Sequence, residues 1–239
     1  MSIDHAEPTL KLFADGADRA TMLELYADPV IRGFTTNPTL MRQAGVTNFE
    51  WFARDLLELI PDRPISFEVL ADDLAEMERQ ALKISAWGEH VYVKVPITNT
   101  TGVTTVALVR RLAGEGLKLN VTAVMTPRQV EQVAGPLEGG PPALVSVFAG
   151  RIADSGRDPV PVMRDALEAL RLCPNCELVW ASPREVLNVV QARDAGCHVI
   201  TLTPDLLRRL PLLGKDLDEF SLETVQMFHR DATAAGYVL

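Results

Sequence analysis

A lysine near the end of an apolar run is the residue whose type and position could do the most chemistry in this chain. The run is Val91-Tyr-Val-Lys-Val-Pro96, and in a β-strand the valines would face one side while Tyr92 and Lys94 face the other. Burial of that other side disfavours the charged ammonium, so more of the Lys94 amine is neutral and able to act as a nucleophile. The alternative is a structural lysine that pairs with a carboxylate or extends to water.

Residues able to bind a polar ligand also fall at the ends of the neighbouring apolar runs. They are Asp15, Thr36, Asn37, Glu68, Asn120, Thr122, Ser146 and Ser182, with Phe148 beside Ser146. Each polar side chain is costly to bury without a partner, so a group of them around one lysine favours a substrate site. Individually, Asp15 or Asn37 could instead cap a helix, and Ser182-Pro183 could begin one.

Two arginines follow neighbouring runs and could bind an anion. Arg151 lies in Phe148-Ala-Gly-Arg-Ile-Ala-Asp154, and Arg184 lies in Ala181-Ser-Pro-Arg184. The guanidinium fork matches the oxygen atoms of a phosphate. Surface salt bridges are the alternative for both, but in an acidic chain two arginines at one end of the fold favour a phosphate pocket.

These residues meet only if the apolar runs are parallel strands. Between the runs lie segments with helical spacing, such as Leu74, Met77, Ala81 and Ile84. This alternation predicts a single (β/α)8 TIM barrel domain over residues 1–239, with its chemistry at the carboxyl ends of the strands. We expect an additional helix at about 221–235, which caps the barrel or contacts another subunit. The expected strands are Leu10–Asp15, Gly33–Thr36, Ile65–Val69, Val91–Val95, Lys118–Val121, Ala143–Phe148, Glu177–Ala181 and His198–Leu202.

Composition excludes several classes of partner. The 239 residues carry a formal net charge of -9, which opposes binding to nucleic acid or to an anionic membrane. The sequence contains neither a signal peptide nor an apolar run long enough to span a bilayer, so we expect a cytoplasmic protein. Three cysteines are too few for a disulfide framework, and we expect Cys173 and Cys176 to be structural. No metal or other cofactor is implied.

Together these motifs resemble those of the transaldolase family. The matching segments are Phe13-Ala-Asp-Gly16, Gly33-Phe-Thr-Thr-Asn-Pro-Thr39, Ser66-Phe-Glu-Val69, Val93-Lys-Val-Pro96, Leu119-Asn-Val-Thr122, Ser146 to Asp154 and Ala181-Ser-Pro-Arg184. They run in family order through all but the two ends of the chain. The Thr-Thr-Asn-Pro motif and the lysine strand are specific as a set, although either alone would be weak.

The resemblance implies a role for each candidate residue. Lys94 would form a Schiff base with a ketose phosphate, Asp15 would move the proton of the C4 hydroxyl, and Glu68 with Thr122 would hold a proton-relaying water. Thr36, Asn37, Asn120, Ser146 and Phe148 would surround the sugar, while Arg151, Ser182 and Arg184 would hold the phosphate. The resemblance also implies a homo-oligomer, such as a decamer, and a place in the pentose phosphate pathway.

Three functions remain open at this point. The chain could be a transaldolase, a fructose-6-phosphate aldolase on the same scaffold, or a silent barrel that binds a phosphorylated sugar. The related aldolases resemble this chain in length but have Gln at the position of Glu68 and Tyr at that of Phe148, so these two residues match the transferase. The presence of the lysine, the acid and the base argues against a silent barrel.

Overall fold

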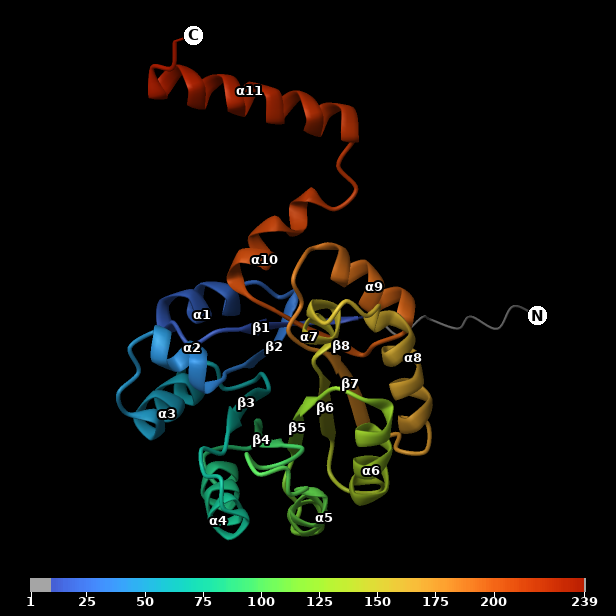
Figure 1. Cartoon of the computed structure of the whole chain (residues 1–239). Coiled ribbons are helices and arrows are strands. Elements are labelled where there is room, and N and C mark those ends of the chain that lie inside the picture. The colour runs from blue at the N-terminus through green and yellow to red at the C-terminus, as the bar shows by residue number, and fades with distance from the viewer. Residues whose placement is uncertain (1–9, 239) are drawn as a thin grey trace, which may run out of the picture. The chain divides into compact units, whose positions relative to one another are not determined.

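The computed structural model of the protein describes residues 10–238, and its strands form a closed parallel barrel in the order β1 to β8 (Figure 1). Each strand pairs with the next along the chain, and β8 pairs with β1 to close the ring. The predicted (β/α)8 TIM barrel is therefore confirmed. The strands are β1 (Lys11–Asp15), β2 (Ile31–Thr35), β3 (Ile65–Glu68), β4 (Val91–Pro96), β5 (Leu119–Val124), β6 (Ala143–Val147), β7 (Cys176–Trp180) and β8 (Val199–Leu202).

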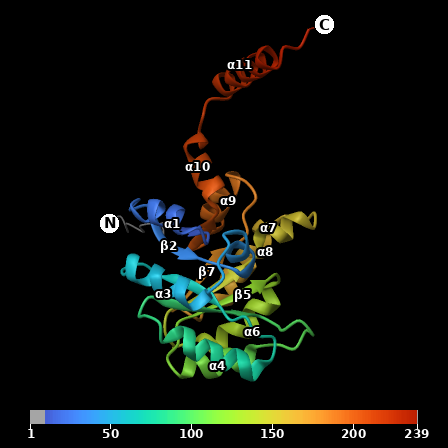
Figure 2. The ribbon, with the colours of Figure 1, turned by 90° about the vertical axis from the view of Figure 1, so that its left-hand side faces the viewer.

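The helices before β8 connect the strands and surround the barrel (Figures 1 and 2), whereas the helices described after β8 connect no strands. Several begin where the sequence supplies a side-chain acceptor for the free backbone N–H groups, as at Thr126, which forms a capping box with Gln129. The helices are α1 (Arg19–Tyr26), α2 (Pro38–Gln43), α3 (Phe49–Leu59), α4 (Leu74–Ser85), α5 (Val106–Gly114), α6 (Pro127–Leu137), α7 (Ala149–Asp154), α8 (Pro159–Leu170), α9 (Leu187–Ala195), α10 (Pro204–Arg209), the short 3₁₀ helix η1 (Leu210–Leu212) and α11 (Leu217–Ala235).

An apolar cluster fills part of the barrel interior. It consists of Phe13, Leu144, Val179, Ala181 and Val199, with Tyr92 and Phe148 packed against it. A Cβ atom at Gly33 would lie 2.6 Å from the Phe13 ring, so this ring occupies space that any other residue at position 33 would need. Because side chains two apart in a strand share a face, Phe13 and Leu144 lie directly below Asp15 and Ser146. The cluster thus supports the polar strand ends.

The chain divides into two compact units, residues 1–207 and residues 208–239, which we describe separately. In the second unit, α11 begins at Leu217 rather than at about 221, because the Asp216 side chain accepts a hydrogen bond from the backbone N–H of Glu219 and caps the helix there. The helix ends at Gly236, whose φ of 67° is left-handed. A single domain over residues 1–239 and a subunit contact through this helix stay predictions.

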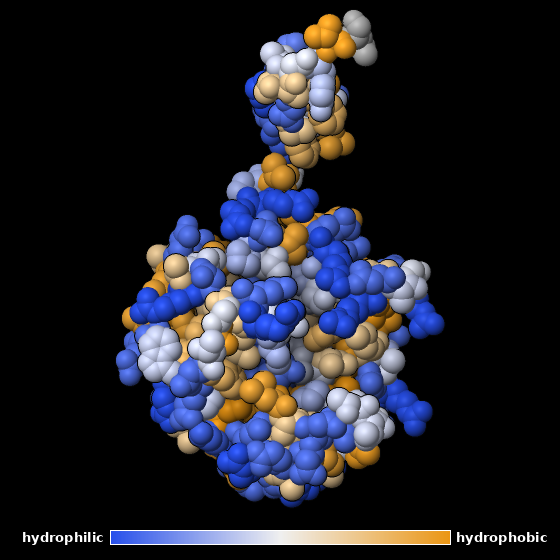
Figure 3. All heavy atoms as spheres, turned by 60° about the vertical axis from the view of Figure 1, so that its left-hand side comes forward, coloured by the Kyte–Doolittle hydropathy of each residue, from blue (hydrophilic) through white to orange (hydrophobic). Residues whose placement is uncertain are grey.

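The surface is mixed in hydropathy. On the face drawn in Figure 3, hydrophilic side chains predominate and apolar side chains form smaller patches among them. Within residues 10–238, no helix combines the length and the apolar character that crossing a membrane requires.

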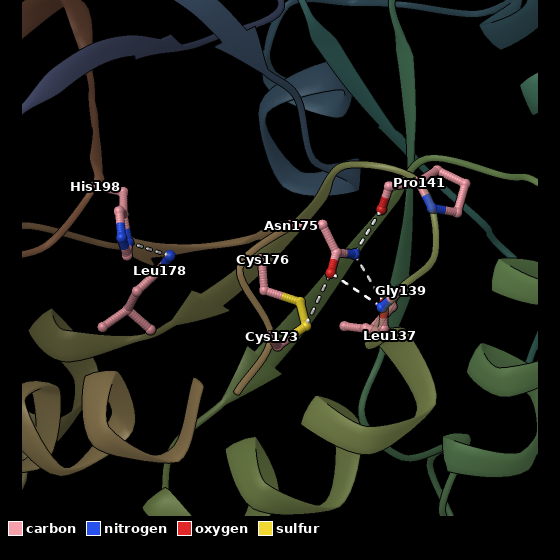
Figure 4. The surroundings of a disulfide bond; sticks show 8 residues. All are labelled: Leu137, Gly139, Pro141, Cys173, Asn175, Cys176, Leu178 and His198. Atoms are coloured by element: carbon pink, nitrogen blue, oxygen red, sulfur yellow. Dashed lines mark hydrogen bonds between the residues drawn. A yellow bond between two sulfur atoms is a disulfide. The ribbon is translucent and has the colours of Figure 1, made fainter. Parts of the chain in front are cut away.

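Cys173 and Cys176 lie in the turn that leads into β7, and the structure joins them in a disulfide (Figure 4). The turn brings their Cα atoms to 5.4 Å, which is within the usual range for such a bond. Between them, the Asn175 amide donates to the carbonyl oxygens of Leu137 and Pro141 at 2.8 and 3.0 Å. The motif therefore ties the loop before β6 to the start of β7, at the end of the barrel opposite the polar strand ends.

Candidate active site

Lys94 lies inside the barrel on β4, as the alternation of its strand predicts. Its residue is 6% exposed, and its Nζ donates a hydrogen bond of 2.8 Å to the backbone carbonyl of Thr36. The nearest carboxylate oxygen described is Glu68 Oε2 at 3.5 Å, from the neighbouring strand β3. The amine is thus hydrogen-bonded to the residue that follows β2 and lies beside a carboxylate from β3. The contact with Glu68 is also the one expected if Lys94 were only a structural ion-pair partner.

Asp15 ends β1 and approaches Lys94 from another strand. Burial raises the pKa of its carboxyl group above the usual value, while the charge of Lys94 and a hydrogen bond from Thr35 act in the opposite direction. The Thr35 hydroxyl donates to Asp15 Oδ1 at 2.8 Å. The helix-cap alternative does not describe this carboxylate, because Asp18 is the residue that caps α1. Asp15 is thus a partly buried carboxylate within electrostatic range of an amine, which suits a general base in an aldol site.

A chain of hydrogen bonds crosses three strands next to Lys94. The Ser146 hydroxyl donates to Asn120 Oδ1 at 2.7 Å, and Asn120 Nδ2 donates to the Ser66 hydroxyl at 3.0 Å. All three residues are buried. The chain fixes the orientation of the Asn120 amide, with its oxygen toward β6 and its nitrogen toward β3.

Thr122 presents a hydroxyl that is buried without a partner in the described part of the chain. The residue is 1% exposed, and its Oγ1 makes no hydrogen bond within residues 10–238. Leaving a buried hydroxyl unpaired costs about 1–3 kcal/mol. The next residue, Ala123, has a left-handed φ of 58°, and the β5–β6 register shifts between Val121 and Val124. This irregularity interrupts the strand pairing at the predicted site.

The two arginines lie on adjoining segments after β6 and β7. A Cβ atom at Gly150 would fall 1.6 Å from the Ser182 carbonyl oxygen, so glycine allows the turn after β7 to pack against α7. Arg184 donates to both carboxylate oxygens of Asp154, through Nε and Nη2, and the Arg151 guanidinium lies 5.5 Å from the centre of the Phe148 ring. The side chains of Arg184 and Asp154 are 49% and 52% exposed, so their pair is weak enough for a phosphate to replace it.

Two other predicted residues have additional structural roles. The Thr36 hydroxyl donates to the Ser66 carbonyl, so Thr36 reaches Lys94 through its backbone oxygen rather than its side chain. Asn37 caps α2, because its Oδ1 accepts a hydrogen bond of 3.0 Å from the backbone N–H of Leu40. Its side-chain nitrogen is the atom that would be left to bind a sugar hydroxyl. The roles of both in substrate binding stay predictions.

Three residues that contact the predicted site were not singled out from the sequence. They are Ser66, Thr35 and Thr201, whose hydroxyls hold Asn120, Asp15 and Thr35 respectively. Alternation could have identified Ser66, which lies two residues before Glu68 on the same face of β3. Thr201 has no such signal, since its partner lies 166 residues away in the sequence.

Comparisons with known proteins identify the family of this chain. The model of the transaldolase/fructose-6-phosphate aldolase family matches residues 12–238. A protein of Symbiobacterium thermophilum named probable transaldolase is 33% identical over 218 residues, which cover 88% of this chain and 95% of that protein. One of Herpetosiphon aurantiacus with the same name is 32% identical over 222 residues, covering 91% of this chain and 96% of that protein.

A solved structure shares the fold but little sequence. Dihydrodipicolinate synthase from Rhodopseudomonas palustris has a TM-score of 0.60 and 13% identity, over 88% of this chain and 77% of that chain. This likeness supports the barrel architecture alone. The family match spans nearly the whole chain, and the chain therefore belongs to the transaldolase/fructose-6-phosphate aldolase family.

Proposed function

We propose that this protein is a transaldolase, which transfers a dihydroxyacetone unit between sugar phosphates through a Schiff base on Lys94. The donors would be fructose 6-phosphate or sedoheptulose 7-phosphate, and the acceptors aldose phosphates. The observation that carries the proposal is the position of the buried Lys94 amine, 3.5 Å from the Glu68 carboxylate and under the electrostatic influence of Asp15. An amine nucleophile, an acid and a base on three strands match the needs of aldol chemistry.

The first step in the proposal joins the donor to the enzyme. The neutral Lys94 amine attacks the C2 carbonyl carbon, and the resulting carbinolamine loses its oxygen as water after protonation. Glu68 is the acid nearest to Lys94 and supplies that proton. A water molecule between Glu68 and Thr122 would give the Thr122 hydroxyl the partner that it lacks in the described residues.

The second step breaks the C3–C4 bond. The Asp15 carboxylate takes the proton of the C4 hydroxyl, the C4 oxygen becomes an aldehyde, and the bonding electrons move through C3 to the iminium nitrogen. The aldose phosphate leaves, and the three-carbon unit stays on Lys94 as an enamine. When an acceptor aldehyde binds, the enamine carbon attacks it and Asp15 returns the proton to the new hydroxyl. The fixed Asn120 amide and Ser146 would hold the hydroxyls of the three-carbon unit.

Transfer rather than cleavage requires that the enamine wait for an acceptor instead of reacting with a proton. Glu68 and Phe148 are the residues that favour transfer, because the related aldolases have Gln and Tyr at these positions. Phe148 has no hydroxyl group that could donate a proton to the enamine carbon, and its ring packs against the apolar cluster. We therefore place transfer ahead of cleavage.

Borohydride trapping tests the Schiff base directly. The protein would be reduced in the presence of fructose 6-phosphate, digested, and analysed by mass spectrometry for a three-carbon adduct on the peptide that contains Lys94. The control is Lys118→Arg, because Lys118 donates to the Glu89 carbonyl away from the site. We expect an adduct in the wild type and in the control but not in Lys94→Arg. A wild-type protein that turns over the sugar without an adduct at Lys94 would refute the proposal.

A second assay separates transfer from cleavage. With fructose 6-phosphate alone, a transferase releases glyceraldehyde 3-phosphate once per active site and then stops until erythrose 4-phosphate is added. Free dihydroxyacetone released at a comparable rate without an acceptor would assign the chain to the aldolases. An adduct without turnover in either assay would favour the silent barrel.

We also propose that the protein is a cytoplasmic homo-oligomer that acts in the pentose phosphate pathway. Support for assembly comes from α11, none of whose described residues is buried although it carries Leu217, Leu222, Val225 and Phe228. These apolar side chains suit contact with another subunit. Light scattering of the full chain, compared with a Val225→Asp/Phe228→Asp variant, tests the assembly. A monomeric wild type would contradict it.

A further inference from the structure

The three strands that meet at β1 carry a chain of hydroxyl groups that ends at Asp15. Thr35 Oγ1 on β2 donates to Asp15 Oδ1 at 2.8 Å, and Thr201 Oγ1 on β8 lies 2.6 Å from Thr35 Oγ1. Thr35 and Thr201 are both buried. Because β1 pairs with β2 on one side and β8 on the other, the backbone of the barrel holds all three side chains in place.

The direction of this chain depends on the protonation of Asp15. A hydroxyl has one proton to donate, and that of Thr35 goes to the Asp15 carboxylate. Thr201 must then be the donor in its contact with Thr35. If Asp15 were protonated at Oδ1, Thr35 would have to accept that proton and donate to Thr201, whose own proton would need a different acceptor. The chain therefore excludes a proton on Oδ1, and its hydrogen bond to Oδ1 is stronger when Asp15 is ionised than when Asp15 carries a proton on Oδ2.

We propose that Thr201 is a positioning residue that acts through Thr35 to keep Asp15 ionised and to fix its Oδ1. The inference rests on the proposed function, in which the Asp15 carboxylate removes the proton of the substrate hydroxyl. Oδ2 takes no part in the hydroxyl chain and is the oxygen left for the substrate. Within residues 10–238 no hydrogen bond joins Thr201 to Asp15, so Thr201 acts indirectly, by orienting the Thr35 hydroxyl that donates to the Asp15 carboxylate.

The surroundings of Asp15 explain why such support matters. Burial disfavours the carboxylate, and the charge of Lys94 on β4 is the main opposing influence. Lys94 also pairs with Glu68 on β3, and it carries no positive charge in the steps in which its amine is neutral. Asp18 and Asp205 line the same cavity as Asp15. The hydroxyl chain is uncharged, so it supports the carboxylate at every stage of the reaction.

The test is the pH dependence of kcat/KM for Thr201→Val, which keeps the shape of threonine but removes the hydroxyl. Since one hydrogen bond is worth about 1 kcal/mol, we expect the acidic limb of the profile to move up by roughly 0.5–1 pH unit. Thr201→Ser keeps a hydroxyl and should restore the wild-type limb. The matched control is Thr105→Val, which removes a buried hydroxyl that donates only to the Pro96 carbonyl and should leave the limb in place.

The position of the acidic limb decides whether the Thr201 hydroxyl supports the Asp15 carboxylate. An unshifted limb in folded Thr201→Val, or an equal shift in Thr105→Val, would overturn the inference. If Thr201→Val does not fold, carboxyl ¹³C titration of Asp15 in Thr201→Ala, which also removes the hydroxyl, is the substitute, and an Asp15 pKa equal to that of the wild type would contradict the proposal. Borohydride trapping at Lys94 is independent of the limb, so failure of the proposed function would appear as a missing adduct in the wild type.

Discussion

Replacing Gly150 by alanine tests how the turn after β7 is positioned. A Cβ atom there would lie 1.6 Å from the Ser182 carbonyl oxygen, whereas carbon and oxygen atoms in close contact stay about 3.3 Å apart. Either α7 or the turn must therefore move by roughly 1.7 Å. Because the obstacle is backbone, no side chain can rotate away. Overpacking of this kind costs about 1–3 kcal/mol, and we expect Gly150→Ala to reach the upper end.

The same displacement should weaken phosphate binding, because Ser182 and Arg184 lie on the turn that moves. A shift of about 1 Å at a positioning group can cost about 100-fold in rate, so we expect kcat/KM for fructose 6-phosphate to fall by roughly 10–100-fold. Activity toward unphosphorylated fructose should fall much less. Urea unfolding measures the stability, and steady-state kinetics with both sugars measure the effect on the site.

Gly114→Ala is the matched control. Gly114 is the last residue of α5 and has nothing within 4 Å of the position of a Cβ atom, so alanine there should stabilise the protein by about 0.5–1 kcal/mol. If Gly150→Ala unfolds at the wild-type urea concentration, the argument that a Cβ atom at position 150 clashes with the Ser182 carbonyl is refuted. If it is destabilised but keeps the wild-type KM for fructose 6-phosphate, the assignment of this turn to the phosphate is wrong.

Three further predictions follow from individual contacts. Arg151→Ala and Arg184→Ala should each raise KM for fructose 6-phosphate far more than they lower kcat, and an unchanged KM in both variants would refute the phosphate site. Asp15→Asn should abolish turnover but raise Tm at pH 7. The pKa of Asp15 is raised in the folded state, so the wild type loses stability as the pH rises from about 3.9 through the folded-state pKa. The asparagine variant has no carboxyl group to ionise and does not lose this stability. The gain in Tm should vanish in acid, and a variant less stable at pH 7 would contradict the sign. Asn175→Ala should cost about 1–3 kcal/mol in urea unfolding, because the backbone groups that its amide binds lose their partner, while kcat/KM stays at the wild-type value.

The sequence predicts the barrel and the inner face of β4 because both depend on local alternation. A strand of period two places Lys94 inside once Val93 and Val95 are placed outside. The hydroxyl chain behind Asp15 could not be predicted, since Thr35 and Thr201 meet only through closure of the barrel. The start of α11 was missed because Asp216 was not recognised as its cap.

Other features depend on backbone geometry that residue types do not reveal. The left-handed φ of Ser182 is unusual for a residue other than glycine, and nothing in Ala181-Ser-Pro-Arg184 requires it. The close contact that Gly150 permits can be seen only when the turn after β7 is placed against α7. The ion pair between Arg184 and Asp154 was also not apparent from the sequence, because the two residues are 30 positions apart and meet only through this contact.

The carboxyl-terminal end of the barrel carries backbone strain and a carboxylate whose charge is disfavoured by burial. At the amino-terminal end, the Asn175 amide is fully engaged with the loop before β6. At the carboxyl-terminal end, Thr122 lacks a partner, and the two left-handed residues other than glycine within residues 10–238, Ala123 and Ser182, both follow strands there. Each such residue costs about 1–3 kcal/mol, and burial adds a further cost at Asp15. The buried Nε1 of Trp87 before β4 also lacks a partner within residues 10–238, so unpaired polar atoms occur at both ends. The two left-handed residues and the burial cost at Asp15 lie at the carboxyl-terminal end, where the proposed substrate would pair with Thr122.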